Sequence, residues 1–378
     1  MKEQLNVGLV GLGFIGKIHA IGYRDIALCF PQPQVTANLK AVLRTGLGRD
    51  QGFLQTANIG METTSMEEFF LQDLDLVDVC SPSAMHTDYV MEAARRGIPV
   101  YCEKPLGKDL ADARLMAEAA VEHNILTHMA FTQRYLPAVR QMKAALDSGE
   151  FGEVLNFRST IFHSSYLDPQ RPMSWRLRWA ESGGGAFADL GAHMIDLVQY
   201  LLGDAARVGA KMRTFITERP ATRGSDQMET VDVDDWALCM MELKNGAIGH
   251  IEATRMAAGI SDQITLQVFC RNGSLHLDAS NPHEIRIHDL KTGCWKSGKL
   301  PFEDVSGERP IHSIYPSAKM SQGKFQDTHM ASCYDFLQCV QQNTPSKSDF
   351  QSALKVQEIL EAAYRSGRTT GEMLDLPL

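Results

Sequence analysis

The chain has 378 residues, of which 44% are hydrophobic and 22% are charged, and its formal net charge is −9. This length favours two domains that each bury a core, and the negative charge argues against general nucleic-acid binding, which normally needs a basic face. No apolar stretch is long enough to span a bilayer, and the N-terminus lacks the apolar core of a signal peptide. The eight cysteines form no CxxC pair. We therefore expect a cytoplasmic protein with buried, reduced thiols.

The first third of the chain alternates short apolar strands with helices. The expected strands cover 7–10, 39–43, 76–80, 100–102 and 125–129, and the expected helices cover about 15–23, 66–70, 88–96 and 109–122. Strands alternating with helices at this spacing predict a parallel, doubly wound sheet. This first domain, of the α/β class, is expected to cover residues 1–131.

The pattern changes after about residue 132, where an irregular segment and then a series of strands follow. Helices are expected at about 138–146 and 192–202, and strands at 208–215, 234–243, 247–253, 265–270 and 274–278. Asn245-Gly246 between two of these strands is a strong hairpin signal. Successive hairpins predict a second, α+β domain over residues 132–378 with a mostly antiparallel sheet. A closing helix at about 350–367 is a candidate to pack back toward the N-terminal domain.

One expected strand of the second domain, from Asp235 to Leu243, is apolar on both of its alternating faces. A sheet that helices cover on one side only should alternate apolar and polar residues. We therefore expect the second face to pack against another subunit. Coverage of a central strand by the chain's own loops is the alternative.

A glycine-rich turn stands between the first expected strand and the first helix. Gly11 would permit the tight turn, Gly13 would allow a pyrophosphate to approach, and Gly16 would allow close packing of the helix on the strand. In this setting the pattern predicts dinucleotide binding, and a purely structural turn is the alternative.

The end of the second expected strand bears on the choice of cofactor. An acidic residue there would hold the ribose 2′-hydroxyl of NAD, but this strand ends at Arg44-Thr45, with Arg49 a few residues later. A guanidinium and a hydroxyl suit a 2′-phosphate, which favours NADP over NAD. Alternatively, Arg44 stacks on the adenine or faces solvent.

Two further segments supply groups that can handle a proton. Lys104 follows a parallel strand and can hydrogen-bond a substrate hydroxyl, although a surface lysine is the alternative; the bond before Pro105 is a candidate for the cis form. Asp189 and His193 are four residues apart at an expected helix start, which places both on one face. An N-cap aspartate and a core histidine are the alternative. No metal-ligand spacing accompanies them, so no metal is expected.

With these segments in place, the chain resembles the Gfo/Idh/MocA oxidoreductase family, named after glucose–fructose oxidoreductase and inositol dehydrogenase. The resemblance covers nearly the whole chain and implies a Rossmann domain plus an open-faced α/β domain that dimerises or tetramerises through its sheet. It also implies a nicotinamide cofactor and a sugar, inositol or related polyol as substrate. The segments that carry it are 11–16, Ser81-Pro82 with His86, 102–107, 183–193 with Asp196, the hairpin at Asn245-Gly246, and the closing helix.

The family's catalytic residues fall on Lys104, Asp189 and His193. In the usual scheme, the histidine exchanges the hydroxyl proton while hydride moves to the nicotinamide, the lysine polarises the oxygen, and the aspartate orients the site. Many members carry an acidic residue where Arg44 stands, so the chain departs from the family there. The residues expected to bind the cofactor are Gly11, Gly13, Phe14, Ile15, Gly16, Arg44, Thr45, Ser81, Pro82, His86, Glu103 and Lys104.

Ser174-Trp175-Arg176 resembles subfamilies that act on monosaccharides and anhydrosugars. Aromatic rings can cover the apolar face of a sugar, while Arg and His bond its hydroxyls. The residues expected to bind substrate are Lys104, Arg134, His163, Tyr166, Trp175, Arg176, Asp189 and His193, with packing or solvent exposure as the alternative for most of them.

The sequence therefore predicts an NAD(P)-dependent dehydrogenase that reversibly oxidises a secondary hydroxyl of a cyclic sugar, anhydrosugar or inositol. Two other functions stay open: a non-catalytic dinucleotide sensor that binds a protein partner, and a glycoside hydrolase or lyase that retains its nicotinamide cofactor.

Overall fold

A computed structural model describes residues 2–298 and 305–378, and the chain divides into two compact units. The first comprises Met1–Gly107, Ala111–Tyr135 and Glu308–Leu354, and the second comprises Lys108–Leu110, Leu136–Gly307 and Lys355–Leu378. The break after Tyr135 lies close to the boundary expected at residue 131. The first unit also takes Glu308–Leu354, however, which the sequence analysis placed in the second domain. Helix α11 (Phe350–Gly367) begins in the first unit and continues in the second.

The first unit contains a six-stranded parallel sheet in the order β3-β2-β1-β4-β5-β6. Its strands are β1 (Gln4–Val10), β2 (Thr36–Leu43), β3 (Glu62–Thr63), β4 (Leu76–Val79), β5 (Val100–Cys102) and β6 (Thr127–Met129). The strand order reverses between β1 and β4, and open α/β sheets bind ligands beyond the carboxyl ends of the strands at such a point. The prediction of a doubly wound parallel sheet is confirmed.

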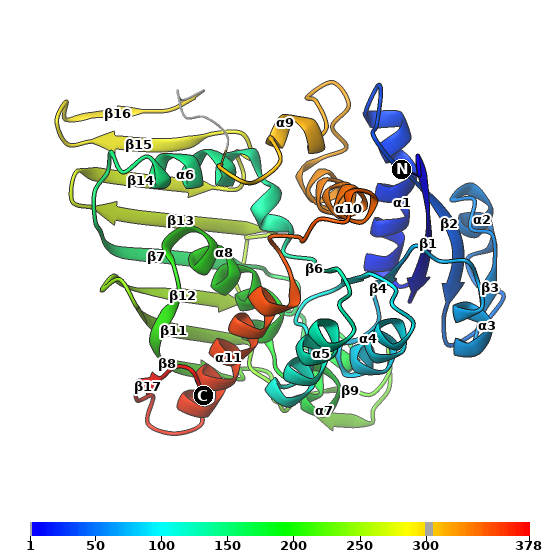
Figure 1. Ribbon diagram of the computed structural model, residues 1–378. Coiled ribbons are helices and arrows are strands. Elements are labelled where there is room, and N and C mark those ends of the chain that lie inside the picture. Colours follow the sequence, from blue (N-terminus) through cyan, green and yellow to red (C-terminus); the bar gives the residue numbers. More distant parts are fainter. Residues whose placement is uncertain (1, 299–304) are drawn as a thin grey trace. The chain divides into compact units, whose positions relative to one another are not determined.

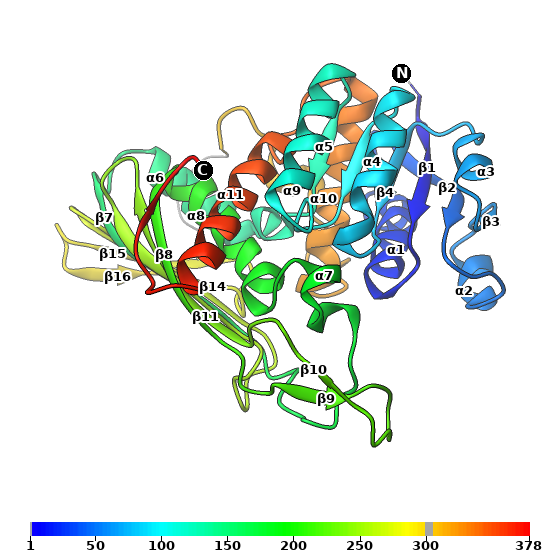
Figure 2. The same ribbon diagram turned by 90° about the horizontal axis from the view of Figure 1, so that it is seen from below.

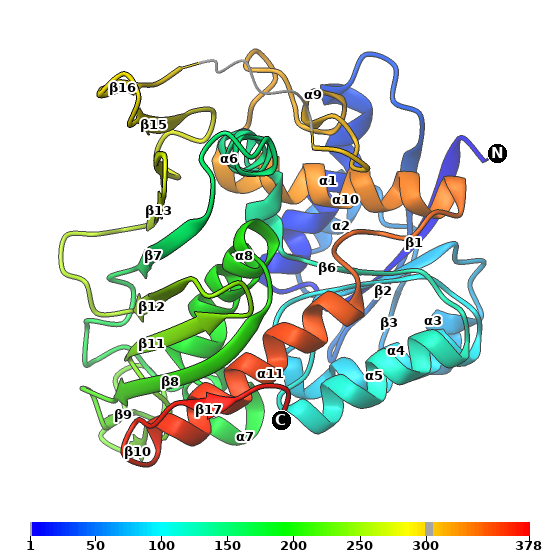
Figure 3. The same ribbon diagram turned by 60° about the vertical axis from the view of Figure 1, so that its left-hand side comes forward.

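Helices cover both faces of this sheet (Figure 3). Helices α1 (Phe14–Cys29) and α10 (Lys324–Gln342) lie on one side, and α4 (His86–Arg95) and α5 (Leu110–Glu122) lie on the other. The shorter helices of this unit are α2 (Gln51–Thr56), α3 (Met66–Phe70) and α9 (Ile311–Ile314). Since helices cover both faces, the side chains of Val7, Leu9 and Val10 in β1 are buried whichever way they point.

The core of the first unit joins the sheet to α1 and α10. Buried residues of β1 and β2, such as Leu9 and Val42, share this core with Tyr23 of α1 and with Met330 and Leu337 of α10. Most of the second unit lies between β2 and α10 in the sequence. Helix α10 nevertheless packs directly on α1. The core of this unit is therefore completed by a distant part of the chain.

The second unit contains a nine-stranded sheet in the order β16-β15-β14-β13-β7-β12-β11-β8-β17 (Figure 1). Every neighbouring pair is antiparallel except β7 with β12, which confirms the mostly antiparallel sheet. Its strands are β7 (Val154–Phe162), β8 (Ala205–Arg213), β11 (Trp236–Leu243), β12 (Ile248–Thr254), β13 (Gln263–Cys270), β14 (Gly273–Asp278), β15 (Ile285–Asp289), β16 (Cys294–Lys296) and β17 (Leu374–Asp375).

Helices cover one face of this sheet. Figure 2 shows α6 (Pro137–Asp147), α8 (Ala192–Leu202) and α11 on the same side of the curved strands. A short helix α7 (Trp179–Ser182) and a ribbon of β9 (Glu218–Pro220) and β10 (Met228–Thr230) belong to the same unit. The turn at Asn245-Gly246 joins β11 to β12, as the sequence predicts, and Gly246 has a φ of +90°.

Strand β11 has one buried face and one open face. Ala237, Cys239 and Met241 are fully buried, whereas Met240, on the other face, is 47% exposed. Among the residues that the structure describes, no helix is both long and apolar enough to cross a bilayer. All eight cysteines are free thiols, and only Cys294 is exposed.

Candidate active site

The glycine turn lies at the carboxyl end of β1. Gly11 has a φ of +91°, and a Cβ on Gly16 would lie 2.2 Å from the Gly11 carbonyl oxygen, so neither position accepts a side chain without movement. A Cβ on Gly13 would meet nothing within 4 Å, which leaves open space beside the start of α1. No side chain caps this helix. Its first N–H groups are thus available to a pyrophosphate, and this geometry fits the predicted cofactor.

Arg44, at the carboxyl end of β2, has carboxylate partners within its own unit. Its Nη1 lies 3.1 Å from Glu62 Oε1, and its Nη2 lies 3.4 Å from Asp50 Oδ2. The guanidinium also donates to the Arg49 carbonyl at 3.1 Å. From the sequence, Arg44 is expected to be a cation available for a 2′-phosphate. In the structure, the guanidinium is already neutralised by nearby acids, which weakens the case for NADP.

His86, predicted to contact the cofactor, is 1% exposed. Its Nδ1 lies 2.9 Å from the Leu106 carbonyl oxygen, and its Nε2 lies 3.0 Å from the Ser81 carbonyl oxygen. Burial lowers the pKa of this imidazole. His86 therefore ties the segment after β4 to the segment after β5, and Ser81 and Pro82 form the backbone that it supports.

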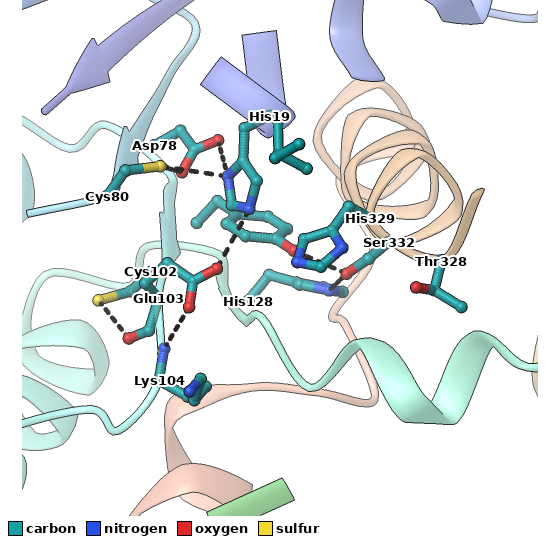
Figure 4. A network of polar contacts seen from close by, with 12 residues as sticks. His19, Asp78, Cys80, Cys102, Glu103, Lys104, His128, Thr328, His329 and Ser332 are labelled. Atoms are coloured by element: carbon teal, nitrogen blue, oxygen red, sulfur yellow. Dashed lines mark hydrogen bonds and ion pairs between the residues drawn. The ribbon is translucent and has the colours of Figure 1, made fainter. Parts of the chain in front are cut away.

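Glu103 and Lys104 directly follow β5, and the Lys104–Pro105 peptide bond is cis. Glu103 is 7% exposed, so its carboxylate lies inside the unit. There it is 3.2 Å from His19 Nε2, and His19 Nδ1 is 2.9 Å from Asp78 Oδ2 (Figure 4). The sequence analysis did not identify His19 or Asp78, whose only sequence signal is a polar residue within an apolar element.

These buried groups include two sets of three possible metal donors with donor atoms within 4.8 Å of one another. One set is His19, Asp78 and Cys80, and the other is His19, Glu103 and His329. The sequence predicts no metal, and neither set has a recognisable ligand spacing in the sequence. In both sets the imidazole of His19 lies at hydrogen-bond or ion-pair distance from a carboxylate. Burial raises the pKa of the Cys80 thiol, so Cys80 is a neutral thiol in this environment.

The second unit carries Asp189 and His193. A π-helical turn, Phe187–Gly191, leads directly into α8, so Asp189 lies in this turn and His193 in the first turn of the helix. The preceding glycines allow the backbone to approach closely, because a Cβ on Gly185 would lie 2.0 Å from the Asp234 carbonyl oxygen. The expected spacing of about one turn between Asp189 and His193 is thus present in the structure.

Two buried residues hold this turn from beneath. Asp234 accepts hydrogen bonds from the backbone N–H of Gly185 at 2.9 Å and of Phe187 at 2.8 Å. The Tyr364 hydroxyl, from α11, donates to Asp234 at 2.7 Å and accepts from the Ala188 N–H at 3.1 Å. Burial raises the pKa of Asp234, while the surrounding donors oppose that rise. Neither residue belongs to a motif that the sequence alone would identify.

Asp189 is paired with a buried arginine. Arg255 Nη2 lies 3.0 Å from Asp189 Oδ2 and donates to the Gly185 carbonyl at 3.2 Å. Arg176 is farther away, with its Nε 4.0 Å from the same carboxylate oxygen, and its guanidinium lies 4.3 Å from the centre of the Trp175 ring. The structure thus places Asp189 near Arg176, which stacks on Trp175, and adds Arg255 as a partner of Asp189.

The other residues predicted to bind substrate lie in different environments. Tyr166 is 6% exposed, and the guanidinium groups of Arg171 and Arg255 lie 4.2 Å and 4.7 Å from the centre of its ring. His163, directly after β7, has its Nε2 3.5 Å from Asp262. Arg134 belongs to the first unit, is 7% exposed and donates to the Lys347 carbonyl at 2.7 Å. Tyr166 and Arg134 are therefore mostly part of the packed interior.

The predicted catalytic residues are divided between the two units. Lys104 belongs to the first unit, and Asp189 and His193 belong to the second. Their joint action on one substrate stays a prediction. Within the first unit, the residues expected to bind cofactor follow β1, β2, β4 and β5, which are adjacent strands of one sheet.

Two family models match this chain. The oxidoreductase family with an NAD-binding Rossmann fold matches residues 5–131, and the GFO/IDH/MocA C-terminal domain matches residues 139–276. These ranges agree with the parallel sheet of the first unit and with a large part of the second.

Relatives and solved structures agree with the family models. Levoglucosan dehydrogenase from Pseudarthrobacter phenanthrenivorans is 31% identical, over 96% of this chain and 97% of its own length. Myo-inositol 2-dehydrogenase from Thermotoga maritima is 27% identical, over 72% of this chain and 75% of its own length. A solved structure of levoglucosan dehydrogenase with NADH and L-sorbose matches with a TM-score of 0.89 and 28% identity, covering 100% of both chains. The chain therefore belongs to the Gfo/Idh/MocA family of oxidoreductases, with an NAD-binding Rossmann domain and the family's C-terminal domain.

Proposed function

We propose that this protein reversibly oxidises a secondary hydroxyl of a cyclic sugar, anhydrosugar or inositol, with a nicotinamide dinucleotide as the hydride acceptor. The observation that carries this proposal is the pairing of Asp189 with Arg255, one turn before His193. A fixed carboxylate beside a histidine is an arrangement suited to moving a hydroxyl proton. The substrate class is supported by the relatives named above, which include levoglucosan and inositol dehydrogenases.

In the proposed mechanism, each protein group has a separate task. His193 accepts the hydroxyl proton of the substrate, and Lys104 donates a hydrogen bond to the same oxygen and stabilises its developing negative charge. Asp189, held by Arg255, orients the substrate and the imidazole. A bound nicotinamide would supply the acceptor for the hydride that leaves the carbinol carbon. In the reverse direction His193 returns the proton to the oxygen.

We further propose that NAD is the preferred cofactor. The carboxylates of Glu62 and Asp50 beside Arg44 would repel a 2′-phosphate, and they can accept a hydrogen bond from a ribose hydroxyl instead. This reverses the preference for NADP that the sequence alone suggests. The solved levoglucosan dehydrogenase structures that contain NADH are consistent with this choice.

The experiment is a spectrophotometric screen for reduced cofactor. The purified protein is mixed with a panel of monosaccharides, anhydrosugars and inositols, each with NAD+ and with NADP+. Turnover with one substrate class would support the proposal and identify the substrate. If no well reacts although calorimetry shows cofactor binding, the dehydrogenase proposal is wrong, and a sensor or a retained-cofactor hydrolase replaces it.

The role of Lys104 has its own variant in this screen. Lys104→Ala is expected to lower kcat at least about 100-fold, the usual contribution of a positioned proton-handling group, while cofactor affinity stays within about threefold. Lys40→Ala, a lysine of β2 in the same unit, is the matched control. Equal losses of turnover and cofactor affinity in Lys104→Ala would contradict this role.

We also propose that the protein forms a homo-oligomer through the open face of the second unit's sheet. Large apolar side chains on this side, including Met240 and Ile248, are 47% and 43% exposed. Monomeric proteins seldom leave such an apolar sheet face in water. Neighbouring charged side chains, such as Arg158 and Glu252, would provide polar contacts in such an interface.

A further inference from the structure

The first unit contains a row of three buried ionisable side chains that the proposed mechanism does not use. Asp78 comes from β4, His19 from α1, and Glu103 follows β5 (Figure 4). Asp78 and His19 are fully buried, and Glu103 is 7% exposed. The imidazole lies between the two carboxylates, 2.9 Å from Asp78 and 3.2 Å from Glu103. We call Asp78, His19 and Glu103 the buried triad.

His19 Nδ1 is at hydrogen-bond distance from Asp78 Oδ2, whereas Nε2 lies at ion-pair distance from Glu103 Oε1 without hydrogen-bond alignment. A positive charge on the ring therefore suits both carboxylates. Burial by itself would lower the pKa of His19, but the charges and hydrogen bonds of Asp78 and Glu103 raise it to about 10. Burial would likewise raise the pKa of Glu103, but His19, and then Lys104, lower it to about 2. At neutral pH the buried triad therefore holds two carboxylates and one cation.

The triad is connected to Lys104 through the second oxygen of Glu103. Glu103 Oε2 accepts a hydrogen bond from the backbone N–H of Lys104 at 3.1 Å, which Figure 4 shows as the last contact of the row. The N–H of Glu103 itself donates to the Val79 carbonyl at 2.9 Å, as part of the sheet. Glu103 is thus the last residue here whose N–H bonds to the sheet. The N–H of the next residue, Lys104, bonds instead to the carboxylate of Glu103.

We propose that His19 is a positioning residue for Lys104, acting through Glu103. The imidazolium keeps Glu103 charged and fixed, and a charged acceptor binds the Lys104 N–H about twice as strongly as a neutral one. This inference rests on the proposed function, because it assigns the triad a purpose in placing Lys104. Cys80 also contacts His19 and Asp78, each at 3.2 Å, but it does not extend the row toward Lys104.

Four single variants test whether His19 positions Lys104 through Glu103. Glu103→Ala and His19→Leu remove successive members of the row, and His19→Gln retains one amide donor for Glu103. Cys80→Ala removes a buried neighbour of the same histidine and serves as the matched structural control. Each variant is compared with the wild type in three measurements: hydrogen exchange of the Lys104 amide, steady-state kinetics, and NADH binding.

The exchange rate of the Lys104 amide measures how well its hydrogen bond to Glu103 is protected, independently of enzyme activity. We expect the Lys104 amide to exchange about tenfold faster or more in Glu103→Ala and His19→Leu, and at the wild-type rate in Cys80→Ala. His19→Gln should restore most of the protection. Unchanged exchange of this amide in His19→Leu would overturn the proposal, as would equal acceleration in Cys80→Ala.

The kinetics connect this backbone position to turnover. Glu103→Ala and His19→Leu should each lower kcat about 100-fold, the usual effect of a displacement of about 1 Å, with NADH affinity within about threefold. Because His19 acts through Glu103, a fifth variant that combines His19→Leu with Glu103→Ala should have the kcat of Glu103→Ala within about twofold. Additive losses would show that His19 acts by another route and would overturn the proposal.

The two proposals fail in different ways. If Lys104→Ala retains full turnover, the proposed role of Lys104 is wrong, while the exchange measurement still decides whether His19 positions its backbone. If Lys104→Ala is inactive and His19→Leu turns over like the wild type, only the inference about the triad is wrong. Loss of activity on chelation, restored by Zn²⁺, would instead identify His19 as a metal ligand and overturn the positioning role.

Discussion

The surroundings of the Arg44 side chain bear on the choice between NAD and NADP. Its guanidinium forms ion pairs with both Glu62 and Asp50. The cofactor preference is therefore expected to depend on these two carboxylates as well as on the arginine. We predict that Glu62→Gln raises kcat/KM for NADP+ relative to NAD+ about tenfold, since removing one charge frees the guanidinium for a phosphate. Steady-state kinetics with both cofactors measure this ratio.

The matched control for this prediction is Glu67→Gln, which removes an acidic side chain from α3 in the same unit. It should leave the cofactor ratio unchanged. A ratio that stays the same in Glu62→Gln would mean that Arg44 does not face the ribose, and the adenine-stacking alternative would take its place.

Single residues also mark where sequence reasoning stops. Asp189, His193 and Lys104 stand in short motifs, and a motif can be recognised without knowledge of the fold. Arg255 reaches Asp189 from 66 residues away, and His19 reaches Asp78 from 59 residues away. Nothing near Arg255 or His19 in the sequence shows these contacts, because the partners meet only when separate strands and helices assemble.

At the scale of elements, the π-helical turn before α8 depends on a contact from α11. Tyr364 donates to Asp234 and accepts from the Ala188 N–H, so its hydroxyl links the helix to the turn that carries Asp189. We predict that Tyr364→Phe lowers the free energy of unfolding by about 2 kcal/mol, because buried polar groups lose their partner. It should also lower kcat, since the turn is less firmly held.

Urea unfolding and steady-state kinetics check this prediction, with Tyr89→Phe on α4 as the control. Tyr89 is a partly buried tyrosine of the other unit, and its substitution should affect neither quantity by as much. Wild-type kcat in Tyr364→Phe would separate the stability of the turn from catalysis and contradict the second half of the prediction.

The elements that the sequence predicts are those with a clear period or a clear stop signal. Helices α3 and α8 begin and end at the expected residues, because Ser65 caps the first and Gly203 follows the second. Helix α10 was missed. Its residues from Gln326 to Cys339 are all buried, including polar ones, so it lacks the apolar stripe that identifies a surface helix.

At the scale of the whole molecule, the proposed oligomer interface is the open face of the second unit's sheet. We predict that Met240→Lys shifts the protein from oligomer to monomer, because burying a charged ammonium group in the interface costs desolvation free energy. Analytical ultracentrifugation measures this shift. Leu71→Lys changes an equally large apolar side chain that is 70% exposed in the first unit, and it should leave the oligomer intact. A wild-type monomer would refute the proposed interface.

Stability should depend on pH through the buried histidines of the first unit. Burial lowers the pKa of His128 and of His329 to about 4, from 6.5, so folding keeps both rings neutral. Their contribution is complete above pH 6.5 and is lost as the pH falls through 4, because the unfolded chain binds these protons first. His19 behaves oppositely: its stabilisation is complete below pH 6.5 and is lost as the pH rises through about 10.

The free energy of unfolding is therefore expected to reach its maximum near pH 6.5, with each proton contributing up to about 1.4 kcal/mol per pH unit on either side. Urea titrations across the pH range test this shape. His329→Asn should reduce the fall in the free energy of unfolding below pH 6.5. His19→Gln should reduce the fall in the free energy of unfolding above pH 6.5. A stability that does not change between pH 4 and pH 6.5 would contradict the assignment of neutral His128 and His329.

Strand β7 is synthesised well before the strands with which it pairs. It pairs with β12 in parallel and with β13 antiparallel, and residues 163–247 must be synthesised before the first of these partners exists. Until then its backbone N–H and C=O groups are open to pairing with another chain, and such non-local pairing is slow. The nascent protein therefore carries an unprotected strand while these intervening residues are made. This interval is when binding by a chaperone would do most to keep newly made chains from aggregating.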